Sequence, residues 1–427
     1  GFLDPDAGGD FSLVDSLQQY ASIGGLQPAV VSEVSSDSID VLLSSGDITQ
    51  INPAGWRWTA HNISSEFRTG DVVYVAMKTG TTQLAQVPEI QGAIVSLDPT
   101  DGALLALTGG FDFYAGKFNR ATQARRQPGS NIKPFIYSAA LDNGFTAATL
   151  VSGTPIVVED DLGDTWRPVN YSKKVFGPTR LRRALVQSLN LVSVRLVRGL
   201  GTPLVIEHLQ QFGFDREHLP QGLSLALGAA NFTPLEMARA YGVFANGGYL
   251  IEPYFIARVE DQKGEITEYA NRTMLCPECA PPTERFTDLD LGILYDPRYS
   301  KRVLSPENAF LMNELMRSVI RTGTGRRALS LGRADLAGKT GTTNNFRDAW
   351  FSGFTWDVVT SVWIGYDTPR DLGSRESGAR AALPIWIDYM EVALQGKPEI
   401  TLQIPENIIK AWVHKDTGEA VAVDDPR

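Results

Sequence analysis

The stretch that most constrains the chain is residues 126–135, which reads Arg-Gln-Pro-Gly-Ser-Asn-Ile-Lys-Pro-Phe. Pro128 and Gly129 end any preceding element and an apolar run follows, so the pattern predicts a helix that begins at or near Ser130. Residues three apart lie on one face of a helix, so we expect the Ser130 hydroxyl to meet the Lys133 amine. The unpaired N–H groups at a helix start favour developing negative charge. The stretch therefore predicts a nucleophile beside a potential base.

A single Ser-x-x-Lys is weak evidence, because a serine often does no more than cap a helix. Here, however, Ser130 is the only serine with a lysine three positions later. Ser188-Leu189-Asn190 follows downstream and Lys339-Thr340-Gly341 comes last. Three motifs of this kind occur in this order in penicillin-binding proteins and serine β-lactamases. Their joint order and completeness favour catalysis over three unrelated caps and turns.

The stretch from about Gln91 to about Gln395 resembles the transpeptidase domain of class A penicillin-binding proteins of the 1A type. The motifs that carry the resemblance are residues 126–134, 188–190, 321–325 (Arg-Thr-Gly-Thr-Gly), 338–343 (Gly-Lys-Thr-Gly-Thr-Thr) and 166–171 (Trp-Arg-Pro-Val-Asn-Tyr). The resemblance implies an α+β fold and a serine enzyme that cross-links peptidoglycan in bacterial cell wall synthesis. It also implies that β-lactams, the penicillin class of antibiotics, acylate and inhibit the enzyme.

The pattern of elements predicts the same architecture. Apolar runs flank an Asp-Gly turn within residues 92–110, helical periodicity dominates the middle of the chain to about residue 246, and large apolar residues alternate in 349–366. Hairpin strands first and last, with helices between, predict an antiparallel central sheet covered by helices. Short β-branched runs in residues 29–77 predict about five strands, an all-β domain that is OB-like by resemblance.

We expect four parts in the chain: a linker remnant (1–28), an OB-like β domain (29–90), the penicillin-binding transpeptidase domain (91–410) and a C-terminal tail (411–427). The chain starts at Gly1 without a signal peptide, and no apolar run approaches 18 residues. We therefore expect a piece of a longer protein. The resemblance implies that its membrane anchor and its N-terminal glycosyltransferase domain lie outside these residues, and that it works at the periplasmic face of the inner membrane.

The expected chemistry is acyl transfer, which needs a nucleophile, a base, a proton relay and donors for the oxyanion. Ser130 is predicted to form an acyl-enzyme with a D-Ala-D-Ala stem peptide, and Lys133 to take its proton. Burial and the nearby Lys339 cation are expected to keep that amine neutral. The further predicted residues are Ser188 as the shuttle to the leaving amine; Asn190 as a partner of Lys133 and the substrate amide; Lys339, Thr340, Gly341, Thr342 and Thr343 as the substrate-binding strand; and the backbone N–H groups of Ser130 and Thr342 as the oxyanion donors.

Residues 78–82 repeat the five letters Lys-Thr-Gly-Thr-Thr of residues 339–343. The first copy precedes Ser130, follows a predicted strand and has Gly80 where a hairpin turn needs a positive φ. We expect it to be a plain turn.

Three other functions share the motifs. A β-lactamase needs a base for deacylation; Glu159 and Asn170 mimic its spacing but precede Ser188, and Leu189 stands where β-lactamases have Asp. A D,D-carboxypeptidase passes the acyl group to water, and a β-lactam receptor only acylates and signals. The extent of the 1A-like segments favours transpeptidation.

The net charge of -10 disfavours nucleic acid as a partner. No cofactor or metal is indicated, because Cys276-Pro-Glu-Cys279 lacks the further ligands of a zinc site and is read as a loop disulfide or a pair of free thiols. The expected partners are peptidoglycan stem peptides, β-lactams and, by resemblance and position, a regulatory protein at the OB-like domain.

Overall fold

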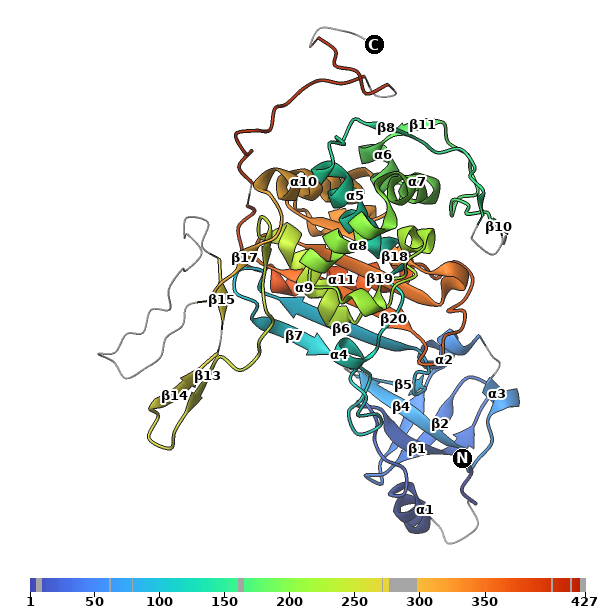
Figure 1. Cartoon of the computed structure of the whole chain (residues 1–427). Helices are drawn as coiled ribbons and strands as arrows, with labels where there is room; N and C mark the ends of the chain where they lie inside the picture. The colour runs from blue at the N-terminus through green and yellow to red at the C-terminus, as the bar shows by residue number, and fades with distance from the viewer. Residues whose placement is uncertain are drawn as a thin grey trace. The chain divides into compact units, whose positions relative to one another are not determined.

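The computed structural model describes residues 1–4, 10–60, 63–78, 80–159, 165–270, 272–275, 298–400, 402–414 and 417–422. The predicted cysteine pair, Cys276 and Cys279, lies outside these residues. The chain divides into two compact units, and Figure 1 shows the elements of each. Unit 1 is Gly1–Glu89 with Gly110–Phe118, and unit 2 is Ile90–Gly109 with Asn119–Arg427.

Unit 1 is a five-stranded antiparallel sheet with the strand order β3-β2-β1-β4-β5. Its strands are β1 (Gln27–Val34), β2 (Ile39–Leu43), β3 (Ile48–Ile51), β4 (Val72–Lys78) and β5 (Thr81–Ala85). The Thr49 and Thr82 hydroxyls of the two edge strands are 2.7 Å apart, so the sheet curls towards closure. This confirms the predicted small OB-like domain. Gly80, with φ +78°, sits in the β4–β5 turn, as expected of the first Lys-Thr-Gly copy.

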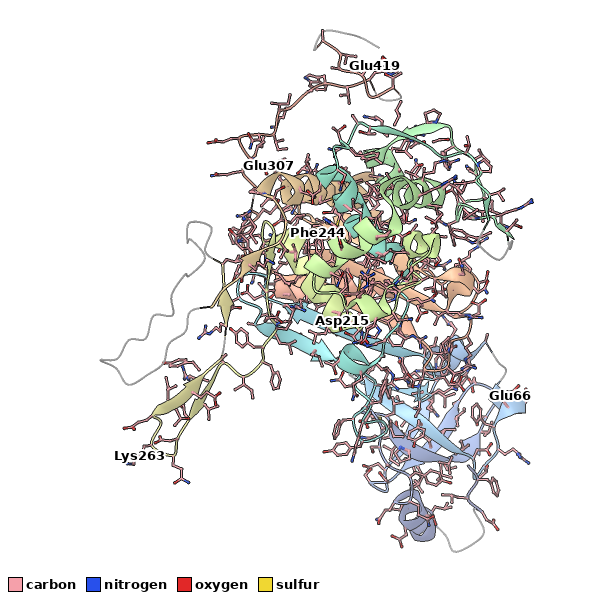
Figure 2. All side chains as sticks on the ribbon, in the orientation of Figure 1. Glu66, Asp215, Phe244, Lys263, Glu307 and Glu419 are labelled. Atoms are coloured by element: carbon pink, nitrogen blue, oxygen red, sulfur yellow. The ribbon has the colours of Figure 1, made fainter. Side chains whose placement is uncertain are left out.

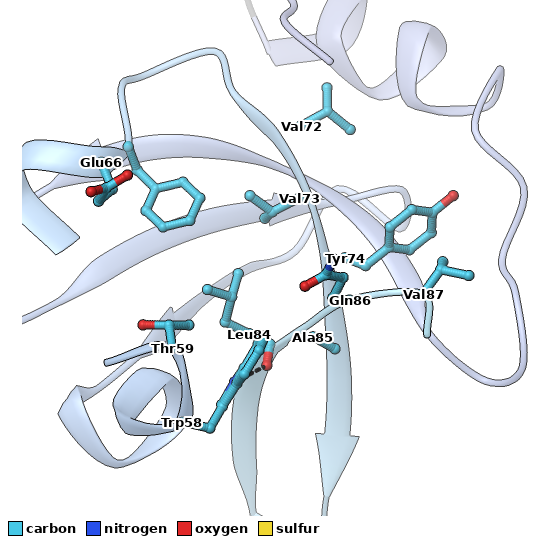
Figure 3. Close-up of a pocket in the computed structure, with 11 residues that line it drawn as sticks. Trp58, Thr59, Glu66, Val72, Val73, Tyr74, Leu84, Ala85, Gln86 and Val87 are labelled. Carbon is cyan, nitrogen blue, oxygen red and sulfur yellow. Dashed lines mark hydrogen bonds between the residues drawn. The ribbon is translucent and has the colours of Figure 1, made fainter. Parts of the chain in front are cut away.

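Short helices complete unit 1: α1 (Asp10–Leu17), α2 (Pro53–Trp56) and α3 (Ile63–Glu66). The stretch predicted as a linker contains α1, whose buried Leu17 packs with Val30 and Leu42 of the sheet. A cavity of about 610 Å³ also opens on this unit, lined by residues of 58–59, 66–67, 72–74 and 84–87. Figure 3 shows Trp58 at its edge, where the indole Nε1–H donates to the Leu84 carbonyl at 2.9 Å.

Unit 2 is built on a second five-stranded antiparallel sheet, with the order β18-β19-β20-β6-β7. Its strands are β6 (Gln91–Leu97), β7 (Leu104–Thr108), β18 (Ala337–Thr342), β19 (Asp348–Phe354) and β20 (Val359–Gly365). The first and last parts of the unit's chain therefore meet in one sheet. Strand β18, which carries Lys339, is an edge strand of this sheet.

Helices cover both faces of this sheet. Successive residues of a strand point to opposite faces, so the residues of β20 show which helices pack on each face. Val359 and Trp363 of β20 join the cluster that contains α5 (Lys133–Asp142) and α9 (Pro234–Ala245). Val358 and Val362 join a separate cluster with α11 (Leu383–Ala393). This arrangement confirms the predicted antiparallel sheet covered by helices.

The larger helical layer also contains α4 (Arg120–Gln123), α6 (Leu181–Val186), α7 (Asn190–Leu200), α8 (Thr202–Gln211) and α10 (Pro306–Thr322). Phe135 of α5 lies at its centre, with the rings of Phe212 and Phe244 at 4.9 and 5.2 Å. Phe244 is labelled within this layer in Figure 2. Thr233 followed by Pro234 in the sequence predicts a helix cap and a first turn. Helix α9 begins there, and the structure adds a capping box between Thr233 and Glu236.

Helical periodicity in the sequence runs through residues 179–186, but the first two of these residues lie in a three-residue strand. Residues Pro178–Arg180 form β11, which pairs with β8 (Leu150–Ser152), so α6 begins only at Leu181. A further hairpin is formed by β13 (Arg258–Glu260) and β14 (Ile266–Tyr269). Two-residue strands complete the unit: β9 (Val158–Glu159), β10 (Thr165–Trp166), β12 (Tyr249–Leu250), β15 (Thr273–Met274), β16 (Arg298–Tyr299) and β17 (Lys301–Arg302). Across the described residues, no helix has the length and apolar character needed to span a bilayer.

Candidate active site

The Ser130 turn lies where the sequence predicts a helix start. Residues Gly129–Ile132 form a single 3-10 turn that continues directly into α5 at Lys133. Gly129 has φ +52°, and Pro134 occupies the first turn of α5, where its missing N–H is not needed. Ser130 is partly exposed, whereas the Lys133 side chain at the start of α5 is fully buried.

The Lys133 amine is held by the loop that carries the second motif. Its Nζ donates to the Ser188 carbonyl at 2.8 Å and to the Asn190 Oδ1 at 2.7 Å, and it lies 3.3 Å from the Ser188 Oγ. Over the described residues, no hydrogen bond joins this amine to the Ser130 hydroxyl. The expected meeting of Ser130 and Lys133 therefore includes no hydrogen bond in this structure, whereas the expected contact of Lys133 with Asn190 is formed, and the amine connects the first motif to the second.

The third motif reaches the same hydroxyl from the sheet. The Lys339 Nζ donates to the Ser188 Oγ at 2.9 Å and to the Thr340 carbonyl at 3.0 Å. Ser188 has φ +54°, a conformation that L-residues adopt at a cost, and it places its side chain between the two amines. One hydroxyl thus lies within hydrogen-bonding distance of two buried lysines from distant parts of the chain.

Burial changes the acid–base properties of both amines. It lowers the pKa of Lys133 well below the ordinary lysine value, and the positive charge of Lys339 lowers it further. Burial also lowers the pKa of Lys339 to about 7. Both shifts have the expected sign, because desolvation and a nearby like charge disfavour the ammonium form. The site therefore favours the neutral form of the Lys133 amine, which is the form that a general base requires.

Strand β18 packs directly against the Ser130 turn through two glycines. A Cβ on Gly341 would overlap the Pro128 carbonyl oxygen, and one on Gly129 would overlap the Thr342 carbonyl oxygen. Only a residue without a side chain permits so close a backbone approach. The strand with the third motif and the helix start with the first motif therefore form adjacent walls of one site.

The register of β18 determines which way the Thr342 N–H points. The Thr343 N–H donates to the Asp348 carbonyl at 3.1 Å, and the neighbouring pair is Thr342 with Ala349. Hydrogen-bonded and non-bonded pairs alternate along an antiparallel ladder, so Thr342 belongs to a non-bonded pair. Because β18 is an edge strand, the Thr342 N–H points away from β19, towards the free edge.

The threonine hydroxyls of the third motif have local partners. The Thr340 and Thr324 hydroxyls are 2.7 Å apart, which gives the Arg-Thr-Gly-Thr-Gly segment a place beside β18. The Thr342 Oγ1 accepts a hydrogen bond from the Gly378 N–H at 3.0 Å, and the Thr343 Oγ1 accepts one from the Asp348 N–H at 2.9 Å. Thr342 and Thr343 remain partly exposed, whereas Thr340 is almost completely buried.

Asn170 supports the site although the sequence analysis gave it no role. Its Oδ1 accepts hydrogen bonds from the backbone N–H groups of Asn190 at 2.9 Å and Leu191 at 3.2 Å, at the start of α7. The Asn190 Nδ2 in turn donates to the Val169 carbonyl at 2.8 Å. The segment around Trp166–Tyr171 is therefore tied to the second motif. Its resemblance to the family was the one signal that it belongs to the site.

A buried ion pair supports the strand end, and nothing local in the sequence indicates it. The Arg126 Nε donates to the Asp348 Oδ1 at 2.8 Å, and the Trp363 indole N–H donates to the same oxygen at 2.9 Å. Both charged side chains are about nine-tenths buried.

Away from this site, Asp215, Glu217 and His218 place ligand atoms within 4.8 Å of one another, but both carboxylate residues are exposed. Such acidic groups are common without an ion.

The fold and the site together define a class. A Ser-x-x-Lys turn, a Ser-x-Asn loop and a Lys-Thr-Gly edge strand, brought together between an antiparallel sheet and a helical layer, are the arrangement of penicillin-recognising serine enzymes. The chain belongs to the penicillin-binding proteins: residues 92–385 match the model of the penicillin-binding protein transpeptidase domain, and residues 2–90 match that of the penicillin-binding protein OB-like domain. Both matches confirm the predicted family.

Individual relatives agree with this assignment. The chain is 42% identical over 96% of its length to penicillin-binding protein 1A of Pseudomonas aeruginosa and 36% identical over 95% to that of Escherichia coli. It spans 54% and 56% of those two proteins, about half of each. The crystal structure of penicillin-binding protein 1A from Haemophilus influenzae superposes with a TM-score of 0.89 and 37% identity, covering 97% of this chain and 64% of that one.

Proposed function

We propose that this chain is the D,D-transpeptidase part of a peptidoglycan synthase and that Ser130 is its nucleophile. The observation that carries the proposal is the convergence of two buried lysines, Lys133 and Lys339, on the Ser188 hydroxyl beside the Ser130 turn. Sequence similarity to penicillin-binding proteins 1A supports the substrate class. The substrate is a stem peptide that ends in D-Ala-D-Ala.

In the acylation step, the Ser130 Oγ attacks the carbonyl carbon of the penultimate D-Ala, and its proton passes to the neutral Lys133 amine. The backbone N–H groups of Ser130 and Thr342 stabilise the oxyanion, a contribution worth about 10²–10³ in rate for each donor. The C–N bond to the terminal D-Ala then breaks. The leaving nitrogen takes its proton from Lys133 through the Ser188 hydroxyl.

In the second step, an acceptor amine attacks the acyl-enzyme carbonyl and releases Ser130. The new amide bond joins two stem peptides, and the acceptor's proton returns to the Ser130 oxygen through Lys133. Thr340 and Thr342, with Lys339, bind the terminal carboxylate of the donor, and Thr343 contributes a further hydroxyl along the strand. The same serine opens the ring of a β-lactam, which leaves an inert acyl-enzyme.

The experiment that tests the function compares the products formed from a D-Ala-D-Ala donor peptide with and without an amine acceptor. We expect D-Ala release together with a cross-linked product that depends on the acceptor. Hydrolysis alone would favour a D,D-carboxypeptidase, and rapid turnover of a β-lactam would favour a β-lactamase. The variant Ser130→Ala is expected to give neither the cross-linked product nor a covalent β-lactam adduct.

We also propose the cellular setting that the family implies. The full-length protein is anchored in the inner membrane by a segment outside these residues and works in the periplasm. Unit 1 offers an apolar cavity next to Trp58, which suits a regulatory protein as partner. A photoreactive residue at position 58 of the full-length protein would test this: we expect one defined cross-linked partner, and the idea fails if that position cross-links only to lipid or to nothing.

A further inference from the structure

The direction in which a substrate must lie defines a further region of the site. This inference rests on the proposed function. With the terminal carboxylate at Lys339 and Thr340 and the reacting carbonyl between Ser130 and Thr342, the donor peptide lies along β18. Its preceding residues then extend towards and past Thr343, at about 3.3 Å of strand per residue.

An aromatic pair adjoins the C-terminal end of β18, the end towards which these residues extend. The Tyr171 and Phe346 rings have centroids 6.0 Å apart and an interplanar angle of 87°, which is an edge-to-face contact. Tyr171 is 68% exposed, although it takes part in this contact. Phe346 follows β18 by four residues, and Tyr171 adjoins Asn170, the residue that supports the second motif. The pair therefore links the end of β18 to the segment beside the second motif. Ser188 and Lys339 link the same two parts of the site at the catalytic end.

The backbone holds Phe346 in an unusual conformation. Asn345 and Phe346 have φ +57° and φ +50°, and two such non-glycine residues in succession are strained. Hydrogen bonds hold the turn: the Phe346 N–H donates to the Thr343 carbonyl at 3.2 Å, and the Leu372 N–H donates to the Phe346 carbonyl at 3.0 Å. Strain of this kind clusters at ligand clamps, where the surrounding structure maintains it.

The opposite ring is positioned just as firmly. Asn170 accepts two backbone hydrogen bonds from the start of α7 and donates to the Lys174 carbonyl at 2.9 Å, so the chain on both sides of Tyr171 is fixed. Tyr171 is exposed and Phe346 is half-buried, and each ring is held by its own anchor, so the pair forms an apolar contact surface rather than part of a core. No described cluster of buried hydrophobic residues includes either ring.

We propose that Tyr171 and Phe346 form an aromatic clamp that selects the acyl side group of the donor. In the stem peptide, this group is the residue that precedes D-Ala-D-Ala, and the clamp accepts a methylene-rich or aromatic chain against the joint surface of its two rings. In a β-lactam, it is the side chain acylated onto the ring-fused nucleus. Tyr171 and Phe346 are thus specificity-determining residues that touch the substrate without taking part in proton transfer.

The test compares two β-lactams that differ only in this group: benzylpenicillin, and 6-aminopenicillanic acid, which lacks the acyl chain. Tyr171→Ala and Phe346→Ala are each expected to weaken the non-covalent binding of benzylpenicillin about tenfold, as partial loss of apolar contact with one ring predicts. The acylation rate constant of the bound complex, and the acylation of 6-aminopenicillanic acid, should change less than about twofold. Tyr171→Phe keeps the ring and should behave as the unchanged protein, and Trp412→Ala, which removes another exposed ring, is the matched control.

The outcomes separate this proposal from the proposed function. If both compounds lose acylation equally in the alanine variants, the rings only support the second motif and the clamp is wrong. Unchanged binding of benzylpenicillin would also overturn the clamp. If the unchanged protein forms no adduct with either compound, the proposed function itself fails.

Discussion

Gly341 offers the sharpest test of the geometry that brings the motifs together. A Cβ at this position would lie 2.9 Å from the Cβ atoms of both Asn131 and Trp350, and closer still to the Pro128 carbonyl oxygen. Ordinary carbon–carbon contacts are about 3.5–4.0 Å, so a methyl group must push β18 away from the Ser130 turn by about 1 Å. A displacement of about 1 Å at a reacting centre costs on the order of 100-fold in rate.

The prediction is therefore that Gly341→Ala lowers the second-order rate constant for acylation by a chromogenic β-lactam about 100-fold. The thermal midpoint of unit 2 should fall by only a few degrees, since overpacking costs about 1–3 kcal/mol. Gly199→Ala is the matched control, because open space surrounds a Cβ at that position, and it should acylate at the original rate. Acylation of Gly341→Ala at the original rate would show that the close approach of β18 to the turn has no part in catalysis.

Three further predictions concern Lys339, Asn170 and the first copy of the Lys-Thr-Gly motif. Lys339→Ala removes the like charge that lowers the pKa of Lys133, so the pKa of Lys133 should rise. The rising limb of the pH profile for the residual acylation should then move to higher pH. A limb that does not move would contradict the electrostatic coupling of the two lysines. Asn170→Ala leaves two backbone N–H groups at the start of α7 without their acceptor and should lower the free energy of unfolding, measured in urea titrations, by about 2 kcal/mol. Asn170→Asp keeps an acceptor and should retain most of the unfolding free energy. Equal losses in both variants would show that the acceptor is unimportant. Lys78→Ala, at the end of β4 where the sequence repeats the third motif, should acylate normally while Lys339→Ala acylates slowly, and equal loss in both would mean that the first copy also takes part.

The sequence predicts the fold well where local patterns determine it. Alternation in residues 349–366 predicts a strand hairpin, and Asp101-Gly102 predicts the turn before β7. Thr233 as cap and Pro234 in the first turn predict the start of α9 in the same way. By contrast, the start of α6 is misplaced by two residues, because pairing of β11 with the distant β8 overrides the helical periodicity. Helical propensity and periodicity depend only on neighbouring residues along the chain, so they do not include pairing with a distant strand.

The same division applies to the site. Spacing and order identify Ser130, Lys133 and Ser188 as one constellation, and the expected contact of Lys133 with Asn190 is formed. They do not predict that the amine also binds the Ser188 carbonyl while it makes no hydrogen bond to the Ser130 hydroxyl among the described residues. That arrangement depends on the positive φ of Ser188, which no pattern in the sequence predicts. The Arg126–Asp348 ion pair likewise joins residues more than two hundred positions apart, and only tertiary structure brings them together.

The central claim is that the Ser130 hydroxyl, activated by a neutral buried amine, is the atom acylated in this chain. Intact-mass analysis after incubation with benzylpenicillin, followed by peptide mapping of the adduct, tests it most directly. The account predicts a single adduct on the peptide that contains Ser130, and no adduct in Ser130→Ala. An adduct on Ser188, or an adduct that persists in Ser130→Ala, would contradict it.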